Sequence, residues 1–359
     1  MGWLRVVLTT ATVLIVTSLG FIIAASFLDT EERAVPDRLA GFHETQISLP
    51  HRGAPIPLFV WYPVVGEGTP ELIGQNSLFY GFHALRDAPV PDRKLPVVLV
   101  SHGSGGNAVS LGWLASHLAT QGAMVVATNH PGTTSRDSTP EATVRIWERP
   151  QDLSAILDLI TNDAPVGLQP DLDNVAALGF SLGGFSVLSL AGVEASKPRF
   201  IEYCATFPDK LDCGWMNEGG LDFDAIEQDK YEQSNLDPRI EAVIAIDPAL
   251  PLAATPESLA EMALPALVIQ LGETKTIPPG MLWEDNVTQM PNAQTAVIPE
   301  TYHFAFLAEC STLGRIIIGL AGDDNICSDN GTRNRPEIHA EVREKTAAFL
   351  AKVLKMDSN

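Results

Sequence analysis

Short apolar runs alternate with helix-like stretches along most of this chain of 359 residues. Val97-Val98-Leu99-Val100 is an uninterrupted apolar run, which is typical of a central parallel strand covered on both faces. Ser110–Thr120 and Gln151–Thr161 instead repeat leucine or isoleucine every three or four residues, which predicts helices with one apolar face. The alternation predicts an α/β fold with a mostly parallel central sheet and helices on both faces.

The predicted strands are Glu44–Leu49, Pro57–Tyr62, Pro96–Ser101, Met124–Asn129, Val175–Phe180, Ala242–Ile246, Ala266–Leu271 and Ala296–Pro299. The first two flank Gly53, and we expect them to form an antiparallel hairpin at the sheet edge. Further helices are predicted at Phe185–Ala191 and His339–Lys355.

The first 33 residues form a separate unit, because Val6 to Leu28 carry no charge. A secretory signal usually has a shorter apolar core, whereas a spanning helix needs about 20 residues. The small residues Ala24 and Ser26 suit a cleavage site. A cleaved signal peptide and a retained membrane anchor both remain open, with a buried core helix as the alternative. Either of the first two readings places residues 34–359 outside the cytoplasm, in the periplasm, secreted or anchored.

Cysteine usage fits an oxidising compartment. The spacings predict the disulfides Cys204–Cys213 and Cys310–Cys327, although four cysteines allow three pairings. No Cys/His ligand cluster is apparent, so we expect no metal and no cofactor. The net charge of −21 excludes nucleic acid as a partner, because such a surface repels phosphates.

Residues 198–237 interrupt the alternation with three glycines, Trp215 and many acidic side chains. Long irregular segments in compact domains are often functional. We expect an insertion over the carboxyl edge of the sheet, which is either a lid or a plain surface loop.

Gly179-Phe180-Ser181-Leu182-Gly183 lies between an apolar strand and a helix. This is the G-x-S-x-G turn in its required context, which raises a serine hydroxyl above the sheet as a nucleophile. Upstream, His102-Gly103-Ser104-Gly105-Gly106 follows another strand and predicts an oxyanion loop. The amides of Ser104 and Leu182 are the candidate donors. A phosphate-binding loop is disfavoured, because the loop has no lysine at the required spacing.

A general base must follow the serine in the chain order Ser, acid, His. His303 comes directly after the last predicted strand, and His339, in the final helix, is the rival. His102 is expected to be structural, and His130 to line the pocket. The acid is either Asp247 or Glu273, which end adjacent strands. Asp247 is preferred because it is short and has few rotamers, and because Lys275 offers Glu273 another partner.

These residues resemble a known group of the α/β-hydrolase superfamily. The group is the bacterial dienelactone-hydrolase-like esterases similar to plasma-type platelet-activating factor acetylhydrolase. The resemblance covers about residues 40–355. It rests on the two glycine motifs above, on Leu58-Phe59-Val60-Trp61-Tyr62-Pro63, Ile246-Asp247-Pro248 and His303-Phe304-Ala305-Phe306-Leu307, and on Arg149-Pro150-Gln151-Asp152-Leu153.

The resemblance implies the α/β-hydrolase fold and metal-free hydrolysis of a small-molecule or lipid ester through an acyl-serine. It also implies that the acid lies on the earlier strand, at Asp247. Dienelactone itself is not implied, because true dienelactone hydrolases use a cysteine where this chain has Ser181. The alternatives are an acyltransferase with the same triad and a non-catalytic binding module on the same fold. A retained anchor would associate the protein with a membrane.

Overall fold

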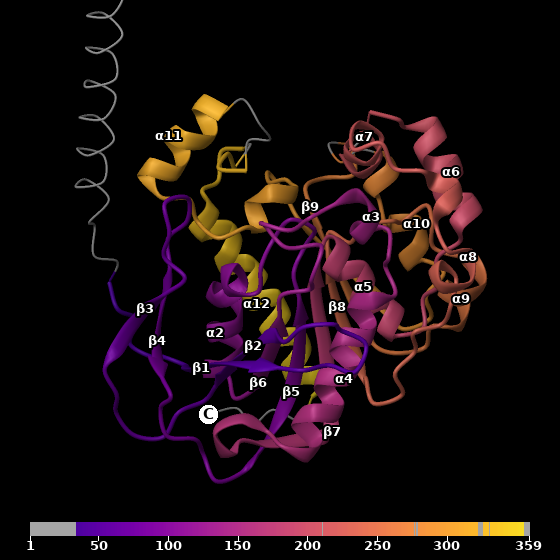
Figure 1. Ribbon diagram of the computed structural model, residues 1–359. Helices are drawn as coiled ribbons and strands as arrows, with labels where there is room; N and C mark the ends of the chain where they lie inside the picture. Colours follow the sequence, from indigo (N-terminus) through magenta and orange to yellow (C-terminus); the bar gives the residue numbers. More distant parts are fainter. Residues whose placement is uncertain are drawn as a thin grey trace, which may run out of the picture.

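A computed structural model describes residues 34–209, 211–275, 277, 279–321, 326–329 and 331–354. Within them lies one sheet of ten strands, in the order β10-β9-β8-β7-β5-β6-β2-β1-β4-β3 (Figure 1). The strands are β1 Gly41–Ile47, β2 Ile56–Tyr62, β3 Pro70–Ile73, β4 Phe82–Arg86, β5 Lys94–Ser101, β6 Met124–Thr128, β7 Gln169–Phe180, β8 Ala242–Ile246, β9 Ala266–Leu271 and β10 Ala293–Ile298.

Strands β6, β5, β7, β8, β9 and β10 pair in parallel, as the apolar runs predicted. Strands β1 and β2 form the predicted antiparallel pair, with Gly41 opposite Tyr62 and Ile47 opposite Ile56. Their predicted place at the sheet edge is wrong, because β4 and β3 extend the sheet beyond β1. Strand β3 has an exposed Pro-Glu-Leu start, so it shows no apolar run from which it could be recognised.

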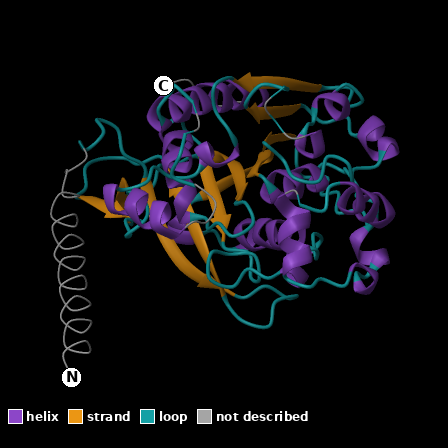
Figure 2. Ribbon diagram, turned by 90° about the horizontal axis from the view of Figure 1, so that it is seen from above, coloured by secondary structure: helices purple, strands orange, loops and turns teal. Residues whose placement is uncertain are grey.

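The helices are α2 Gly112–Thr120, α3 Pro140–Thr143, α4 Glu148–Asn162, α5 Leu182–Leu190, α6 Lys197–Thr206, α7 Leu211–Glu218, α8 Gln228–Tyr231, α9 Pro256–Glu261, α10 Glu284–Val287, α11 Thr312–Ala321 and α12 Arg335–Val353. Helices α2 and α12 pack together on one face of the sheet, and α4 and α5 pack together on the other. Figure 2 shows the sheet between these helical layers.

Strand β5 shows how the two layers divide the core. Leu95, Val97 and Leu99 belong to the apolar cluster that includes α4 and α5, whereas Val98 and Val100 belong to the cluster with α2 and α12. Successive side chains of a strand point to opposite faces, so an uninterrupted apolar run fills both layers. Burial on both faces fixes the carboxyl ends of the parallel strands, from which the candidate site is built.

The predicted insertion, residues 198–237, is largely helical, since α6, α7 and α8 run through it. Helix α6 begins at an N-cap, where the Ser196 side chain accepts a hydrogen bond from the amide of Arg199, and Pro198 occupies the first turn. Helices α6 to α10 gather at the upper right of Figure 1.

Both predicted disulfides are confirmed, Cys204–Cys213 between α6 and α7 and Cys310–Cys327 around α11. Such bonds persist in oxidising compartments, which supports a location outside the cytoplasm. None of the described helices has the length and apolar character needed to cross a membrane. The predicted signal or anchor, residues 1–33, lies outside the described part of the chain.

Candidate active site

Ser181 occupies the turn between β7 and α5, with φ 54° and ψ −121°. A non-glycine residue in this region is strained and persists only where its surroundings enforce it. The neighbouring glycines provide the close approach that the turn requires. A Cβ on Gly179 would lie 2.0 Å from the carbonyl oxygen of Gly183, and a Cβ on Gly183 would lie 2.1 Å from that of Ser101. The G-x-S-x-G spacing therefore has a steric cause in this structure.

His303 brings the candidate base to this serine. Its Nε2 lies 3.1 Å from Ser181 Oγ, and its Nδ1 lies 2.6 Å from Oδ2 of Asp247. With Nδ1–H donating to the carboxylate, Nε2 is free to accept the serine proton. The ring of His303 packs on Phe180, with centroids 4.7 Å apart. Neither the His303 nor the Asp247 side chain is more than 14% exposed, so the carboxylate is screened from solvent.

The structure brings Asp247, and not Glu273, to His303. Asp247 ends β8 in a positive-φ conformation, and its second oxygen, Oδ1, accepts the amide of Leu271 at 3.2 Å. Glu273 forms an ion pair of 3.0 Å with Lys275. The rival base His339 lies on α12, where its Nε2 donates to the carbonyls of Ala305 and Leu307. His339 thereby supports the turn that begins at His303.

The two predicted oxyanion donors converge beside Ser181. As the first residue of α5, Leu182 has an amide without a partner inside the helix. No acceptor among the described residues bonds to the amide of Ser104. A Cβ on Gly103 would lie 3.3 Å from Cβ of Ser181, so the loop packs directly on the serine.

Ser104 and Leu182 also line a small, mainly apolar cavity of about 10 Å³. The insertion covers this cavity with Phe200, Met216 and Tyr231. A volume of about 10–15 Å³ on this measure is what one water molecule needs. The space beside the two amides therefore admits only a small group while the insertion is in place.

A second Ser–His–Asp chain lies buried under the oxyanion loop. Ser101 Oγ lies 3.0 Å from Nε2 of His130, whose Nδ1 lies 2.8 Å from Oδ2 of Asp152. All three residues are fully buried, so this serine cannot meet a substrate. The prediction that His130 lines the pocket is wrong, because its ring is buried between Ser101 and Asp152.

The buried chain holds the oxyanion loop through His102. The amide of His130 donates to Nε2 of His102, and His102 Nδ1 donates to the carbonyl of Gly103 at 2.7 Å. The guanidinium of Arg149 donates to the carbonyl of His102. His102 is therefore structural, as predicted, and it ties the loop to α4.

Burial sets the protonation of this cluster. It lowers the pKa of His130 to about 4, with Arg149 acting in the same direction and Asp152 opposing. Burial also lowers the pKa of His102 well below its ordinary value, and that of Arg149 to about 9. Burial raises the pKa of Asp152, but hydrogen bonds from His130, His51 and Arg52 outweigh it and the net pKa is lowered. At neutral pH the cluster thus holds neutral histidines between charged partners.

Sequence reasoning assigned no role to Arg149 and Asp152 and overlooked Arg52, which pairs with Asp152. The Arg149-Pro150-Gln151-Asp152 stretch was visible only as part of a resemblance. Arg52 meets Asp152 through Nε and Nη2, both at 2.7 Å, across a separation of 100 residues. A pair so distant in sequence leaves no local pattern. Two buried nitrogens of the Arg149 guanidinium, Nε and Nη1, have no hydrogen-bond partner among the described residues.

Comparison with known proteins bears on the fold of this chain. No family profile and no curated protein sequence matches the chain. Among solved structures, a ferulic acid esterase from Streptomyces cinnamoneus is similar over 91% of this chain and 94% of its own, with 18% identity and a TM-score of 0.61. A putative dienelactone hydrolase from Klebsiella pneumoniae aligns over 87% of this chain and 99% of its own, with 14% identity and a TM-score of 0.45. The sheet, the turn at Ser181 and the first of these likenesses together show that this chain has the α/β-hydrolase fold.

Proposed function

We propose that the protein is a serine hydrolase that cleaves carboxylic esters outside the cytoplasm. The observation that carries the proposal is the hydrogen-bonded chain from Ser181 through His303 to Asp247, beside two amides that have no acceptor among the described residues. The esterase with the same fold adds support at the level of reaction class.

In the proposed reaction, Ser181 Oγ attacks the ester carbonyl while His303 Nε2 takes its proton. Asp247 holds the imidazole and stabilises its charged form. The oxygen of the tetrahedral intermediate accepts hydrogen bonds from the amides of Ser104 and Leu182, each worth about 3–4 kcal/mol in the transition state. His303 then protonates the departing alcohol, and water attacks the acyl-serine with His303 again as base.

The cavity beside the two amides supports a preference for short acyl groups. Its volume of about 10 Å³ has room for roughly one heavy atom, such as the methyl group of an acetyl ester, and Phe200 and Met216 of the insertion close it. We therefore assign residues 198–237 the role of a lid that limits acyl length. Catalytic efficiency should fall in the series p-nitrophenyl acetate, butyrate, octanoate.

A fluorophosphonate probe tests the nucleophile directly. We expect one label, on Ser181, and none on Ser101, which belongs to the buried chain. Ser181→Ala should abolish labelling and lower hydrolysis by about 10³-fold or more. The matched control Ser101→Ala should keep both. Labelling elsewhere, or turnover by folded Ser181→Ala protein, would remove the proposal. Product analysis with added alcohols separates hydrolysis from acyl transfer.

A further inference from the structure

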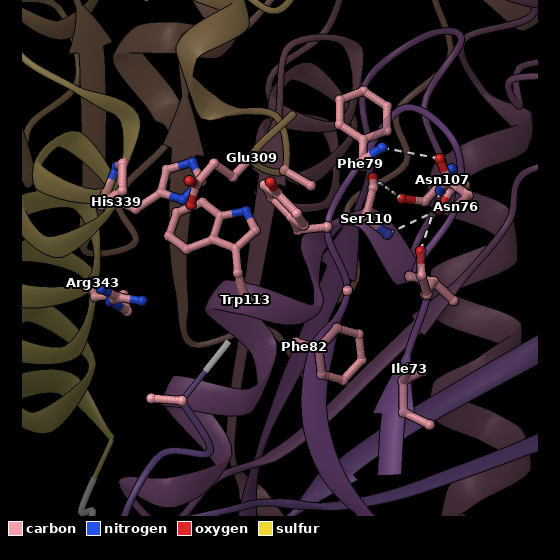
Figure 3. Close-up of a pocket in the computed structure, with 17 residues that line it drawn as sticks. Ile73, Asn76, Phe79, Phe82, Asn107, Ser110, Trp113, Glu309, His339 and Arg343 are labelled. Carbon is pink, nitrogen blue, oxygen red and sulfur yellow. Dashed lines mark hydrogen bonds between the residues drawn. The ribbon is translucent and has the colours of Figure 1, made fainter. Parts of the chain in front are cut away.

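A second, larger cavity lies apart from the Ser181 site and shares no lining residue with the proposed triad. It has a volume of about 400 Å³, within the range of small-molecule sites. Figure 3 shows His339 and Arg343 of α12 at one side of it, Asn76, Asn107 and Ser110 at the other, and Trp113 and Phe82 between them.

The walls of this cavity are preformed. The side chain of Asn76 accepts the amides of Leu78 and Phe79 and donates to the carbonyl of Gly74, which fixes the loop after β3. Phe82 packs against Gly112, where a Cβ would lie 2.0 Å from the ring. A ligand would therefore meet a shaped site at little ordering cost.

Arg343 gives the cavity a positive charge without a counter-ion. Its side chain is half-buried, and among the described residues it forms no ion pair or hydrogen bond through its guanidinium. Burial is the sole resolved cause acting on the pKa of Arg343, which it lowers, and no carboxylate raises it. Glu309 also lines the cavity. An unpaired arginine is notable in a chain of net charge −21.

Trp113 adds an apolar wall. Its Nε1 is buried and has no partner among the described residues. One face of the indole stacks on His339, with centroids 3.6 Å apart and an angle of 3°, and the Arg343 guanidinium lies 6.0 Å from the ring centroid. The apolar side chains of Ile73, Phe82 and Val109 complete the lining.

We propose that this cavity is a second ligand site, for a small carboxylate with an apolar body. Arg343 would pair with the carboxylate, since a guanidinium matches its geometry. Phe82, Val109 and Ile73 would cover the apolar part. The proposal does not depend on ester hydrolysis at Ser181.

Calorimetric titration of the full chain tests it with 3-phenylpropionate and its neutral isostere, 3-phenylpropionamide. We expect the carboxylate to bind about 10- to 100-fold more tightly than the amide, which is the effect of a hydrogen bond to a charged group. Arg343→Gln should remove this difference. The matched control Lys345→Gln makes the same charge change two residues further along α12, where the lysine pairs with Glu341, and should leave it intact.

Protein labelled at Ser181 with a fluorophosphonate should bind the carboxylate unchanged. If labelling abolished binding, the carboxylate would be bound in the triad site and the proposal would be overturned. So would the absence of binding to the unmodified protein, or equal affinities of Arg343→Gln and the parent, with folding checked by circular dichroism. If Ser181 takes no label, the esterase proposal fails while the titrations of unlabelled protein still decide this one.

Discussion

His130 should make the protein acid-labile below the ordinary pKa of histidine. Its pKa is about 4 in the folded state, because the ring is buried, and about 6.5 in an unfolded chain. Between these values the unfolded chain binds a proton that the folded protein does not, so falling pH favours unfolding. The loss for this one residue is about 2 kcal/mol at pH 5 and approaches about 3 kcal/mol below pH 4.

Urea unfolding at pH 7 and pH 5, followed by circular dichroism, measures this loss. His130→Asn should be less stable than the parent at pH 7, because it loses the contact with Ser101, but its stability should fall by about 2 kcal/mol less on acidification. His83→Gln, on β4, is the control and should keep the parental dependence. Burial also lowers the pKa of His339, to about 3, and that of His102. On acidification the parent therefore loses more free energy of unfolding than His130 alone accounts for. An unchanged pH dependence in folded His130→Asn would refute the reasoning.

Four further substitutions test the site by steady-state kinetics on folded protein. Asp247→Asn should lower kcat by about 10⁴-fold because it disturbs the histidine tautomer, whereas Glu273→Gln should keep most activity; the reverse ranking would move the acid. Met216→Ala should enlarge the small cavity and raise kcat/KM for p-nitrophenyl butyrate relative to acetate; an unchanged ratio would exclude the lid from acyl selection. Arg149→Lys should lower kcat with little change in KM, because the oxyanion loop loses its tie to α4; equal kcat would make Arg149 purely structural.

The sequence predicted the parts of the fold whose cause is local. Apolar runs located the central strands, and Ala242–Ile246 and Ala266–Leu271 were predicted to the residue. Strands β3 and β4, at one end of the sheet, were missed because short, partly exposed strands bury too little to leave a pattern. The last helix starts at Arg335, four residues before the prediction, although Asn334 and Glu337 form a capping box that marks its start.

In the candidate site, too, the residues that belong to local motifs were predicted and those brought together by the fold were not. The turn at Ser181 is a local motif, and chain order was enough to select His303. The choice between Asp247 and Glu273 needed the structure, since both end neighbouring strands and only their directions differ. The buried cluster of His130, Asp152 and Arg149 joins segments far apart in the chain, and its geometry arises only when the sheet is assembled.

The two disulfides bear on how the protein is best produced. Each closes a short loop, with sequence separations of 9 and 17, and each ties together elements outside the central sheet. Cys204–Cys213 joins the two helices that supply Phe200 and Met216 to the small cavity. Each bond stabilises by about 3 kcal/mol on loop entropy, while the sheet has its own apolar core. We therefore expect material made in a reducing bacterial cytosol to keep the secondary structure of the disulfide-bonded form and to lose the proposed selectivity for short esters, so that circular dichroism would not distinguish the two preparations.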